Sequence, residues 1–330
     1  MRKRIVVLLL VGVLCLASGA LFGAGKPIVI GVSFDNINHP YWNADIAGMQ
    51  EMAKSLGAEL KILNAQGDVT AQNQQIESLI AAKVDAIICI PADNKAVMQA
   101  IKKANQAKIP FVWNDRAIFS TDEGKVSFGV GTDNFTLAKN GAQWMADTAK
   151  KNGQKLKVLI LLGPLTDNNA IERDKGFSAA IEANPDVMQL VAKVPAGWDE
   201  AKSLAATVNA LQANKDINAI LMPADLQLPA VASALKQYKK YIKVGTKGHV
   251  MLGALNGDKV ALDAVKDGYA DVVMCQPILD TGRQTVKAAV DLVNGKKLDP
   301  NGVLSPGFLV YKDNFEATAY DAYGYFGTKK

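Results

Sequence analysis

The chain has 330 residues, of which 49% are apolar and 21% are charged. This composition is typical of packed globular domains and excludes a disordered protein, and the length accommodates two domains of ordinary size. The formal net charge is +5, but residues 2–4 carry three of the positive charges and the other charges are scattered. The charge pattern therefore does not indicate a nucleic-acid-binding protein.

The amino-terminal segment has the order of a secretory signal peptide. Basic residues 2–4 precede the apolar run 5–17, and small residues follow at 17–20. We assign residues 1–25 to a cleaved signal peptide, so we expect a periplasmic or extracytoplasmic protein. An uncleaved anchor is the alternative, because the segment is just long enough to span a membrane. Cys15 lies in this segment, but the residue before it makes a poor lipoprotein signature.

The chain after residue 25 alternates strand-like apolar runs with amphipathic helical stretches. The first run, residues 28–34, precedes a helix over residues 41–56 that has Pro40 at its start and Gly57 just past its end. The later runs that we expect to form strands are 85–90, 109–113, 157–162, 217–222, 250–254 and 272–275. Strands that alternate with helices of about 10 to 15 residues predict βαβ units and parallel sheets.

One of these runs occurs twice. Residues 85–93 (DAIICIPAD) recur as residues 218–225 (NAILMPAD), and each copy follows a polar amphipathic stretch, at residues 70–83 and 200–215. A buried parallel strand has this pattern where it reaches its carboxyl end, the end at which open α/β sheets bind ligands. The repeat therefore predicts an α/β protein of two similar doubly wound parallel-sheet lobes, joined by a hinge and facing each other across a cleft.

No low-complexity linker separates the two lobes, so we expect short connections between them. The chain should pass between the lobes near Thr132 and again near Gln276, where the last helix, residues 278–294, has no further strand-rich lobe to complete. We expect one lobe to comprise residues 26–131 plus 277–306, and the other to comprise residues 132–276 plus 307–330.

Polar and aromatic residues gather in loops that follow the predicted strands. Aromatic faces pack against the C–H faces of a sugar ring, and carboxylates, amides and guanidinium groups satisfy its hydroxyls. The candidate residues for binding a polyhydroxylated molecule are Asp35, Asn36, His39, Tyr41, Trp42, Asp115, Arg116, Asp167, Asn168, Arg173, Trp198, Asp225, Asn256 and Gln276. Trp113 lies within a strand run and is expected in the core. A surface ion pair is the alternative for the neighbouring Asp115 and Arg116.

The sequence gives little support to an enzyme. The two histidines, His39 and His249, are far apart, and no Gly-x-Ser-x-Gly motif or metal-spaced Cys/His cluster is present. Residues 129–131 (GVG) lack the third glycine of a dinucleotide fingerprint. We therefore expect no catalytic residue, cofactor or metal, although an exported carbohydrate-active enzyme on the same sheets is the alternative class. A transcriptional regulator would carry a helix-turn-helix in place of the signal peptide.

Two cysteines, Cys89 and Cys275, remain after the signal peptide, and both lie in apolar runs. We expect buried free thiols there. A disulfide between them is the alternative in an oxidising compartment.

Five motifs of the chain resemble those of the periplasmic sugar-binding proteins of the ribose-binding type. They are D-x-x-x-H-P-Y-W at residues 35–42, IPFVWNDR at 109–116, GTDN at 131–134, ERDKGF at 172–177 and QP at 276–277. The resemblance covers essentially all of the chain after the signal peptide, in the same order. It implies a type I periplasmic binding protein, a monomer that closes around a monosaccharide or sugar alcohol and delivers it to the permease of an ABC importer.

The resemblance also implies roles for individual residues. Tyr41, Trp42 and Trp198 become ring-stacking residues, and the implied hydroxyl partners are Asp115, Arg116, Arg173 and Gln276.

Four contacts depart from those of the ribose binders. His39 stands where they have Asn, Asp35 where they have a small hydroxyl residue, Ala224 where they have Asn, and residues 255–256 (LN) where they have Phe-Asp.

Two segments of the chain, residues 223–230 and 166–168, are closer to the branch that binds rhamnose and a furanose-like autoinducer. That branch is therefore the alternative for the ligand, although its autoinducer binders have Lys in place of Asp35.

Overall fold

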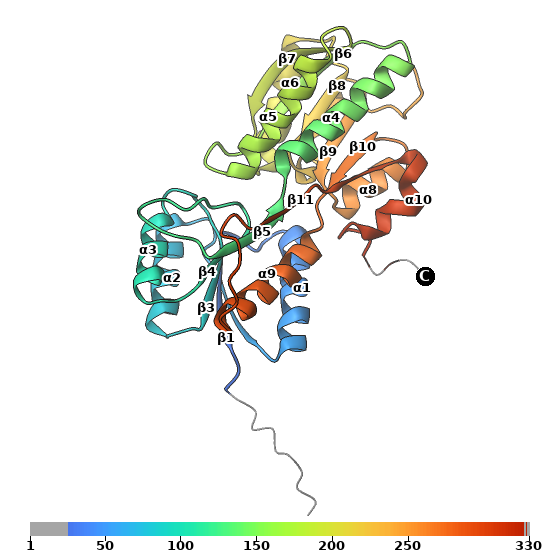
Figure 1. Cartoon of the computed structure of the whole chain (residues 1–330). Helices are drawn as coiled ribbons and strands as arrows, with labels where there is room; N and C mark the ends of the chain where they lie inside the picture. Colours follow the sequence, from blue (N-terminus) through green and yellow to red (C-terminus); the bar gives the residue numbers. More distant parts are fainter. Residues whose placement is uncertain (1–25, 327, 329–330) are drawn as a thin grey trace, which may run out of the picture.

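The computed structural model describes residues 26–326 and 328, so the predicted signal peptide lies outside the described residues. Two lobes lie one above the other (Figure 1). The strands of the lower lobe, lobe one, are β1 (Val29–Phe34), β2 (Glu59–Asn64), β3 (Ala86–Ile90), β4 (Phe111–Asp115), β5 (Phe128–Thr132) and β11 (Val303–Ser305). The strands of lobe two are β6 (Leu156–Leu162), β7 (Met188–Pro195), β8 (Ala219–Met222), β9 (Met251–Asn256), β10 (Val272–Cys275) and β12 (Phe308–Tyr311).

The two sheets have the same plan. Their strand orders are β11-β5-β4-β3-β1-β2 and β12-β10-β9-β8-β6-β7. All neighbouring strands are parallel except β10 and β12, which pair in an antiparallel register. The structure thus confirms the predicted fold class, two similar doubly wound parallel-sheet lobes.

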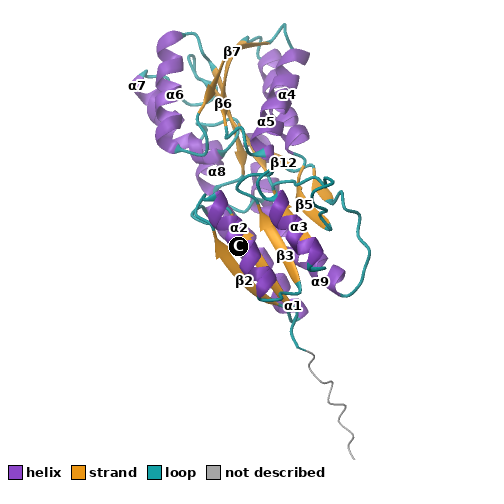
Figure 2. Cartoon of the chain, turned by 90° about the vertical axis from the view of Figure 1, so that its left-hand side faces the viewer, coloured by secondary structure: helices purple, strands orange, loops and turns teal. Residues whose placement is uncertain are grey.

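Helices cover both faces of each sheet (Figure 2). Those of lobe one are α1 (Pro40–Leu56), α2 (Val69–Ala81), α3 (Met98–Gln106) and α9 (Ile278–Val293). Those of lobe two are α4 (Asn134–Lys151), α5 (Asn168–Ala183), α6 (Glu200–Ala213), α7 (Leu228–Gln237), α8 (Lys259–Lys266) and α10 (Phe315–Thr318), with short 3-10 helices at η1 (Asp225–Gln227), η2 (Lys312–Asn314) and η3 (Ala319–Asp321). Each face of a sheet has its own apolar core, shared with α1 and α9, α2 and α3, α4 and α5, or α6, α7, α8 and α10.

The first helix begins and ends where its sequence predicts. Pro40 occupies the first turn, where a missing N–H has no cost. Nδ1 of His39 accepts a hydrogen bond from the backbone N–H of Tyr41 (3.1 Å) and so caps the helix. Gly57 ends the helix with a left-handed φ of 66°. These local signals fix the orientation of His39, Tyr41 and Trp42 at the edge of the cleft.

The repeated segment forms equivalent strands of the two lobes. Its copies, β3 and β8, occupy the same place in the two strand orders. The first residue of each copy makes an equivalent hydrogen bond: Asp85 accepts from the backbone N–H of Val29, and Asn218 from that of Lys157, both at 2.7 Å. The repeated sequence therefore corresponds to equivalent strands in the two lobes. Both Pro-Ala-Asp segments lie at the carboxyl ends of central strands.

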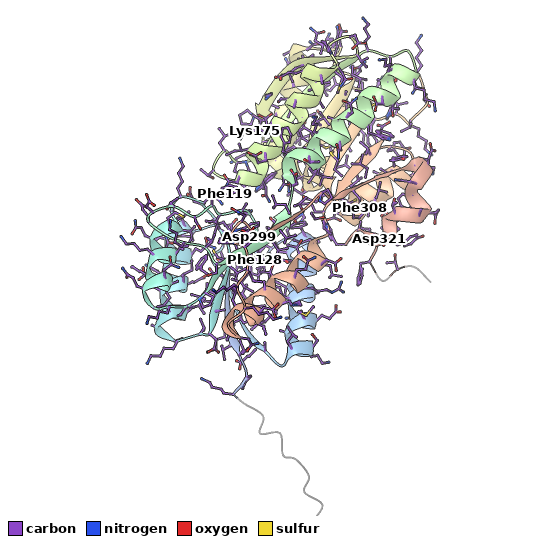
Figure 3. All side chains as sticks on the ribbon, viewed as in Figure 1. Phe119, Phe128, Lys175, Asp299, Phe308 and Asp321 are labelled. Carbon is purple, nitrogen blue, oxygen red and sulfur yellow. The ribbon has the colours of Figure 1, made fainter. Side chains whose placement is uncertain are left out.

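The chain passes between the two sheets three times. It leaves lobe one between β5 and α4, returns between β10 and α9, and leaves again between β11 and β12. Phe308, the first residue of β12, lies at the junction of the lobes (Figure 3). We propose lobe boundaries at these crossings, with residues 26–131 plus 277–306 in lobe one and 132–276 plus 307–330 in lobe two.

Several predictions about single side chains are confirmed. Cys89 and Cys275 are buried free thiols, and Trp113 is a core residue with 2% of its surface exposed. No helix in the described part of the chain has the length and apolar character needed to cross a membrane.

Candidate functional site

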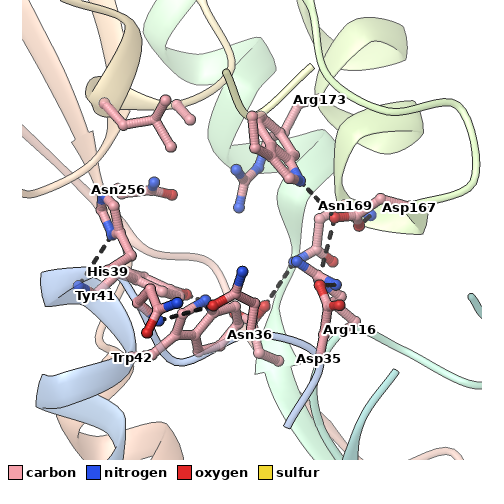
Figure 4. A pocket seen from close by; sticks show the side chains of 15 residues that line it. Asp35, Asn36, His39, Tyr41, Trp42, Arg116, Asp167, Asn169, Arg173 and Asn256 are labelled. Carbon is pink, nitrogen blue, oxygen red and sulfur yellow. Dashed lines mark hydrogen bonds and ion pairs between the residues drawn. The ribbon is translucent and has the colours of Figure 1, made fainter. Parts of the chain in front are cut away.

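A cavity of about 230 Å³ lies between the two lobes, at the carboxyl ends of the central strands (Figure 4). Its walls come from both lobes. The lining residues are Asp35, Asn36, Asn38, His39, Tyr41, Trp42, Asp115 and Arg116 of lobe one, and Asp167, Asn169, Arg173, Trp198, Ala224, Leu226 and Asn256 of lobe two.

The structure brings most of the predicted site residues together in this cavity. Eleven of them line it: Asp35, Asn36, His39, Tyr41, Trp42, Asp115, Arg116, Asp167, Arg173, Trp198 and Asn256. The prediction missed Asn38, Asn169, Ala224 and Leu226. Asn169 lies in the same polar run as Asp167, and Leu226 follows Asp225, so proximity in sequence was the available signal for these two. For Ala224 the signal was the comparison with ribose binders, which have Asn at this position.

Three predicted residues lie outside the cavity lining. The side chain of Asn168 donates a hydrogen bond to the backbone carbonyl of Ala117 (2.9 Å). Gln276 donates from Nε2 to Oδ1 of Asn256 (2.7 Å), and Asp225 accepts from Nδ2 of the same residue (3.3 Å). The structure therefore places Asp225 and Gln276 behind Asn256, where they orient its amide, because β8 and β10 direct them to β9.

Arg116 is held between carboxylates of the two lobes. Its Nη1 donates to Asp35 of lobe one (2.7 Å), and its Nε lies 3.1 Å from Oδ2 of Asp167 in lobe two. Burial opposes the charge of Arg116, but Asp167 and Asp35 outweigh it and raise the pKa of the guanidinium. Asp115 and Arg116 are only 4% and 6% exposed, so the alternative of a surface ion pair is excluded.

Asp115 accepts hydrogen bonds on both oxygens. Oδ1 accepts from the hydroxyl of Tyr41 (2.5 Å), and Oδ2 accepts from the side-chain amide of Asn169 (2.9 Å) in the opposite lobe. Burial raises the pKa of Asp115, while the Tyr41 hydrogen bond and the charges of Arg173 and Arg116 oppose that rise. Because two donors point at it, the ionised carboxylate is the form that satisfies both.

The repeated Pro-Ala-Asp segments hold the two guanidinium groups. The carbonyl of Pro91 accepts from Nη1 of Arg116 (2.8 Å), and the carbonyl of Pro223 accepts from Nη1 of Arg173 (2.7 Å). Arg173 also donates from Nε to Asn134 (2.7 Å). No hydrogen bond joins Nη2 of either arginine to the residues that the structure describes. These nitrogens are therefore available as donors to the oxygens of a ligand.

Each lobe contributes an indole ring to the cavity. Trp42 packs edge to face against Phe34 and Tyr41, with centroid distances of 5.8 and 4.8 Å. Trp198 donates from Nε1 to Asp167 (3.0 Å), and the guanidinium of Arg173 lies 5.8 Å from its ring centre. Trp42 is thus part of the core of lobe one, whereas Trp198 is fixed by polar contacts in a loop of lobe two.

His39 has one nitrogen left for a ligand, because Nδ1 accepts from the backbone of Tyr41. Burial lowers the pKa of His39, and the charge of Asp258 opposes this only in part. The imidazole is therefore neutral at pH 7, with its proton on Nε2, and can donate a hydrogen bond. Within residues 26–326 and 328, no group of three His, Cys, Asp or Glu side chains could hold a metal ion.

Comparison with known proteins agrees with this architecture. Residues 30–297 match the model of the periplasmic binding protein domain. The chain belongs to the periplasmic binding protein family. It is 30% identical to the ribose import binding protein of Bacillus subtilis over 277 residues, which cover 84% of this chain and 85% of that protein. It is 26% identical to the D-xylose-binding periplasmic protein of Haemophilus influenzae over 311 residues, covering 93% and 89% of the two chains.

A solved structure extends the comparison to three dimensions. The solute-binding protein of an ABC transporter from Bacillus halodurans, with bound myo-inositol, is 26% identical and superposes with a TM-score of 0.79. The match covers 91% of this chain and 99% of that one. The family is one of solute-binding proteins, which confirms the class of protein predicted from the sequence.

Proposed function

We propose that this protein captures a monosaccharide or a sugar alcohol between its lobes and delivers it to the permease of an ABC importer. The observation that carries the proposal is the inter-lobe cavity, which joins an indole ring of each lobe to two anchored guanidinium groups. Rings cover the C–H faces of a cyclic polyol, and the guanidinium nitrogens donate to its hydroxyls.

The size of the cavity supports a small ligand. At about 230 Å³ it is below the range of roughly 300–1,000 Å³ that drug-sized ligands occupy. Relatives and neighbours with names for ribose, D-xylose and myo-inositol support the same class. Rhamnose and the furanose-like autoinducer are the alternative ligands. In the autoinducer binders a Lys stands in place of Asp35, whose carboxylate is here committed to Arg116.

The setting that we propose follows from the family and from the amino-terminal sequence. The chain is exported, its signal peptide is removed, and the mature protein works as a monomer in the periplasm or another extracytoplasmic space. Its partners are the small ligand and the membrane subunits of the importer, and binding requires no cofactor.

A thermal-shift screen followed by calorimetry tests the proposal. The panel comprises ribose, xylose, allose, rhamnose, myo-inositol and the autoinducer, added to the purified mature chain. A ligand that binds only the folded state stabilises it by about 2.7 kcal/mol at a hundred times its Kd. We expect at least one member to raise the melting temperature and to bind one to one. No binding by any pentose, hexose or polyol would refute the proposal, and turnover of a bound sugar would favour the enzyme.

A further inference from the structure

The first turn of α5 reaches across the cleft to the loop that follows β4. Three consecutive residues of lobe two each contact one of three consecutive residues of lobe one. Asn169 donates to Asp115 (2.9 Å), Asp167 lies 3.1 Å from Nε of Arg116, and Asn168 donates to the carbonyl of Ala117 (2.9 Å). We call residues 167–169 and 115–117 the clasp.

Within the clasp, Asn168 differs from its neighbours. Asp167 and Asn169 line the ligand cavity, as do Asp115 and Arg116, but Asn168 does not. Its acceptor is a backbone carbonyl of the opposite lobe, and that carbonyl also accepts a hydrogen bond from Asn94 of lobe one (2.7 Å). The carbonyl of Ala117 is thus held in place by a residue of its own lobe. The bond of Asn168 joins lobe to lobe and involves no cavity group.

The helix turn that carries the donor, Asn168, is also held in place. Asp167 is the N-cap of α5, and its Oδ1 accepts from the backbone N–H of Asn169 (2.9 Å), which orders the first turn. Behind that turn, α5 packs against α4, where a Cβ on Gly176 would lie 2.3 Å from the carbonyl oxygen of Phe135. Because α5 packs this closely against α4, the position of its first turn in lobe two is fixed.

From this geometry we infer that Asn168 is a positioning residue for ligand binding, one that raises affinity by favouring the closed form without touching the ligand. The inference rests on the proposed function. The Asn168 bond joins the two lobes and involves no cavity group, so it stabilises this closed arrangement by the same amount with any ligand, or with none. Apparent affinity scales with the fraction of binding-competent protein, so loss of this bond weakens every ligand by one common factor.

The variant Asn168→Asp tests the inference most cleanly. It keeps the shape of the side chain but replaces the donor with an acceptor that faces the Ala117 carbonyl. A carboxylate in the first turn of a helix interacts favourably with the helix dipole, so α5 keeps its stability. A net hydrogen bond corresponds to about a threefold to tenfold change in an equilibrium. We expect affinity to fall by at least this factor, with no loss in melting temperature, and Asn168→Ala to show a smaller decrease.

The matched control is Asn105→Ala. Asn105 donates to the carbonyl of Lys125 at the same distance, 2.9 Å, and also accepts from the backbone N–H of Lys125 (2.8 Å), but both residues belong to lobe one. We expect this variant to lower stability and to leave affinity unchanged. Calorimetry is done with two ligands from the screen, one pentose and one cyclitol. The inter-lobe distance of the empty protein is measured with fluorophores on Lys102→Cys and Lys202→Cys, exposed positions in α3 and α6.

Three results separate the possible outcomes. Equal factors of loss for both ligands, together with a longer inter-lobe distance in the empty Asn168→Asp protein, support the inference. Unchanged affinity and distance overturn it. A loss confined to one ligand also overturns it, because that pattern requires direct contact between Asn168 and the ligand. If the unmodified protein binds none of the panel, the proposed function fails instead, and the distance measurement on the empty protein still tests the clasp.

Discussion

Asp115 and Asn256 end equivalent strands of the two lobes, and both have a positive φ, 63° for Asp115 and 133° for Asn256. Asp and Asn are the residues other than Gly that adopt positive φ most readily. Such backbone strain persists only where surrounding contacts impose it, and it gathers at functional sites. Here the strain turns the last side chain of β4 and of β9 into the same cavity, and hydrogen bonds from Tyr41 and Gln276 hold these side chains.

The first prediction concerns Asp115, which we expect to accept hydrogen bonds from ligand hydroxyls. Asp115→Ala leaves the hydroxyl of Tyr41 and the amide of Asn169 without their acceptor. Affinity should fall by about 1 to 3 kcal/mol, the cost of leaving a buried hydrogen-bond partner unsatisfied. Calorimetry measures this, with Asp122→Ala as a control for the same charge change at an exposed site. If the Asp115→Ala protein binds the ligand as tightly as the unmodified protein does, this carboxylate does not bind the ligand.

The two indole rings should respond differently to truncation. Trp42 packs in the core of lobe one, so Trp42→Ala should cost about 3 to 5 kcal/mol of folding free energy. Trp198→Ala should lower affinity with a smaller loss of stability, because Trp198 lies in a half-buried loop. Denaturant unfolding and ligand-induced tryptophan fluorescence measure the two effects. If the fluorescence response comes wholly from the other two tryptophans, the core residue Trp113 and Trp144 of α4, the assignment of the stacking rings is wrong.

The close contact between α1 and α9 depends on glycine. A Cβ on Gly282 would lie 2.3 Å from the backbone carbonyl oxygen of Asp45, so Gly282→Ala forces the helices apart. We expect a loss of about 1 to 3 kcal/mol, the cost of overpacking a core. Lys287→Ala, in the same helix, removes only an exposed ion pair with Asp291 and should cost less than about 0.5 kcal/mol. If the Gly282→Ala protein is as stable as the unmodified protein, the close packing of α1 on α9 is contradicted.

Stability should depend on pH through His249. Its Nδ1 faces the carbonyl of Ile242 (2.6 Å) and its Nε2 faces Asp271 (2.9 Å), so both nitrogens need a proton. Burial opposes the charged imidazole, but Asp271 and the carbonyl outweigh it and raise the pKa of His249. The stabilisation is therefore complete below the unfolded pKa of about 6.5 and is lost as pH rises through the folded pKa, at up to about 1.4 kcal/mol per pH unit. The difference in unfolding free energy between the natural chain and His249→Gln should shrink over that interval. A difference independent of pH would refute this.

The sequence predicted the seven strands that carry continuous apolar runs and missed β2, β5, β7, β11 and β12, for physical reasons. Strand β5 lies inside its sheet, but Gly129 and Gly131 interrupt its apolar run. Central strands such as β3 and β8 are buried on both faces and read as continuous apolar runs. Strands β2 and β7 lie at the edges of their sheets and mix exposed with partly buried residues, so they carry no such run. Strand β11 has three residues, and its pairing with β5 depends on the chain crossing between lobes.

Ligands bind at the carboxyl ends of parallel strands, and this rule predicted the cavity residues Asp35, Asp115 and Asn256 from the sequence. The rule gives the place of a residue and not the direction of its side chain. Neither the turn of Asn168 toward the opposite lobe nor that of Gln276 toward Asn256 could be read from position, because both depend on partners far away in the chain.

Hydrogen–deuterium exchange, with and without a ligand from the screen, shows whether the ligand lies between the lobes. Saturating ligand should slow the exchange of backbone amides in both lobes. In lobe one these lie in residues 35–42 and 115–117, and in lobe two in residues 167–169 and 256–258, because these segments line or flank the cavity. Slowed exchange in the segments of only one lobe, at full saturation, would contradict a ligand enclosed by both.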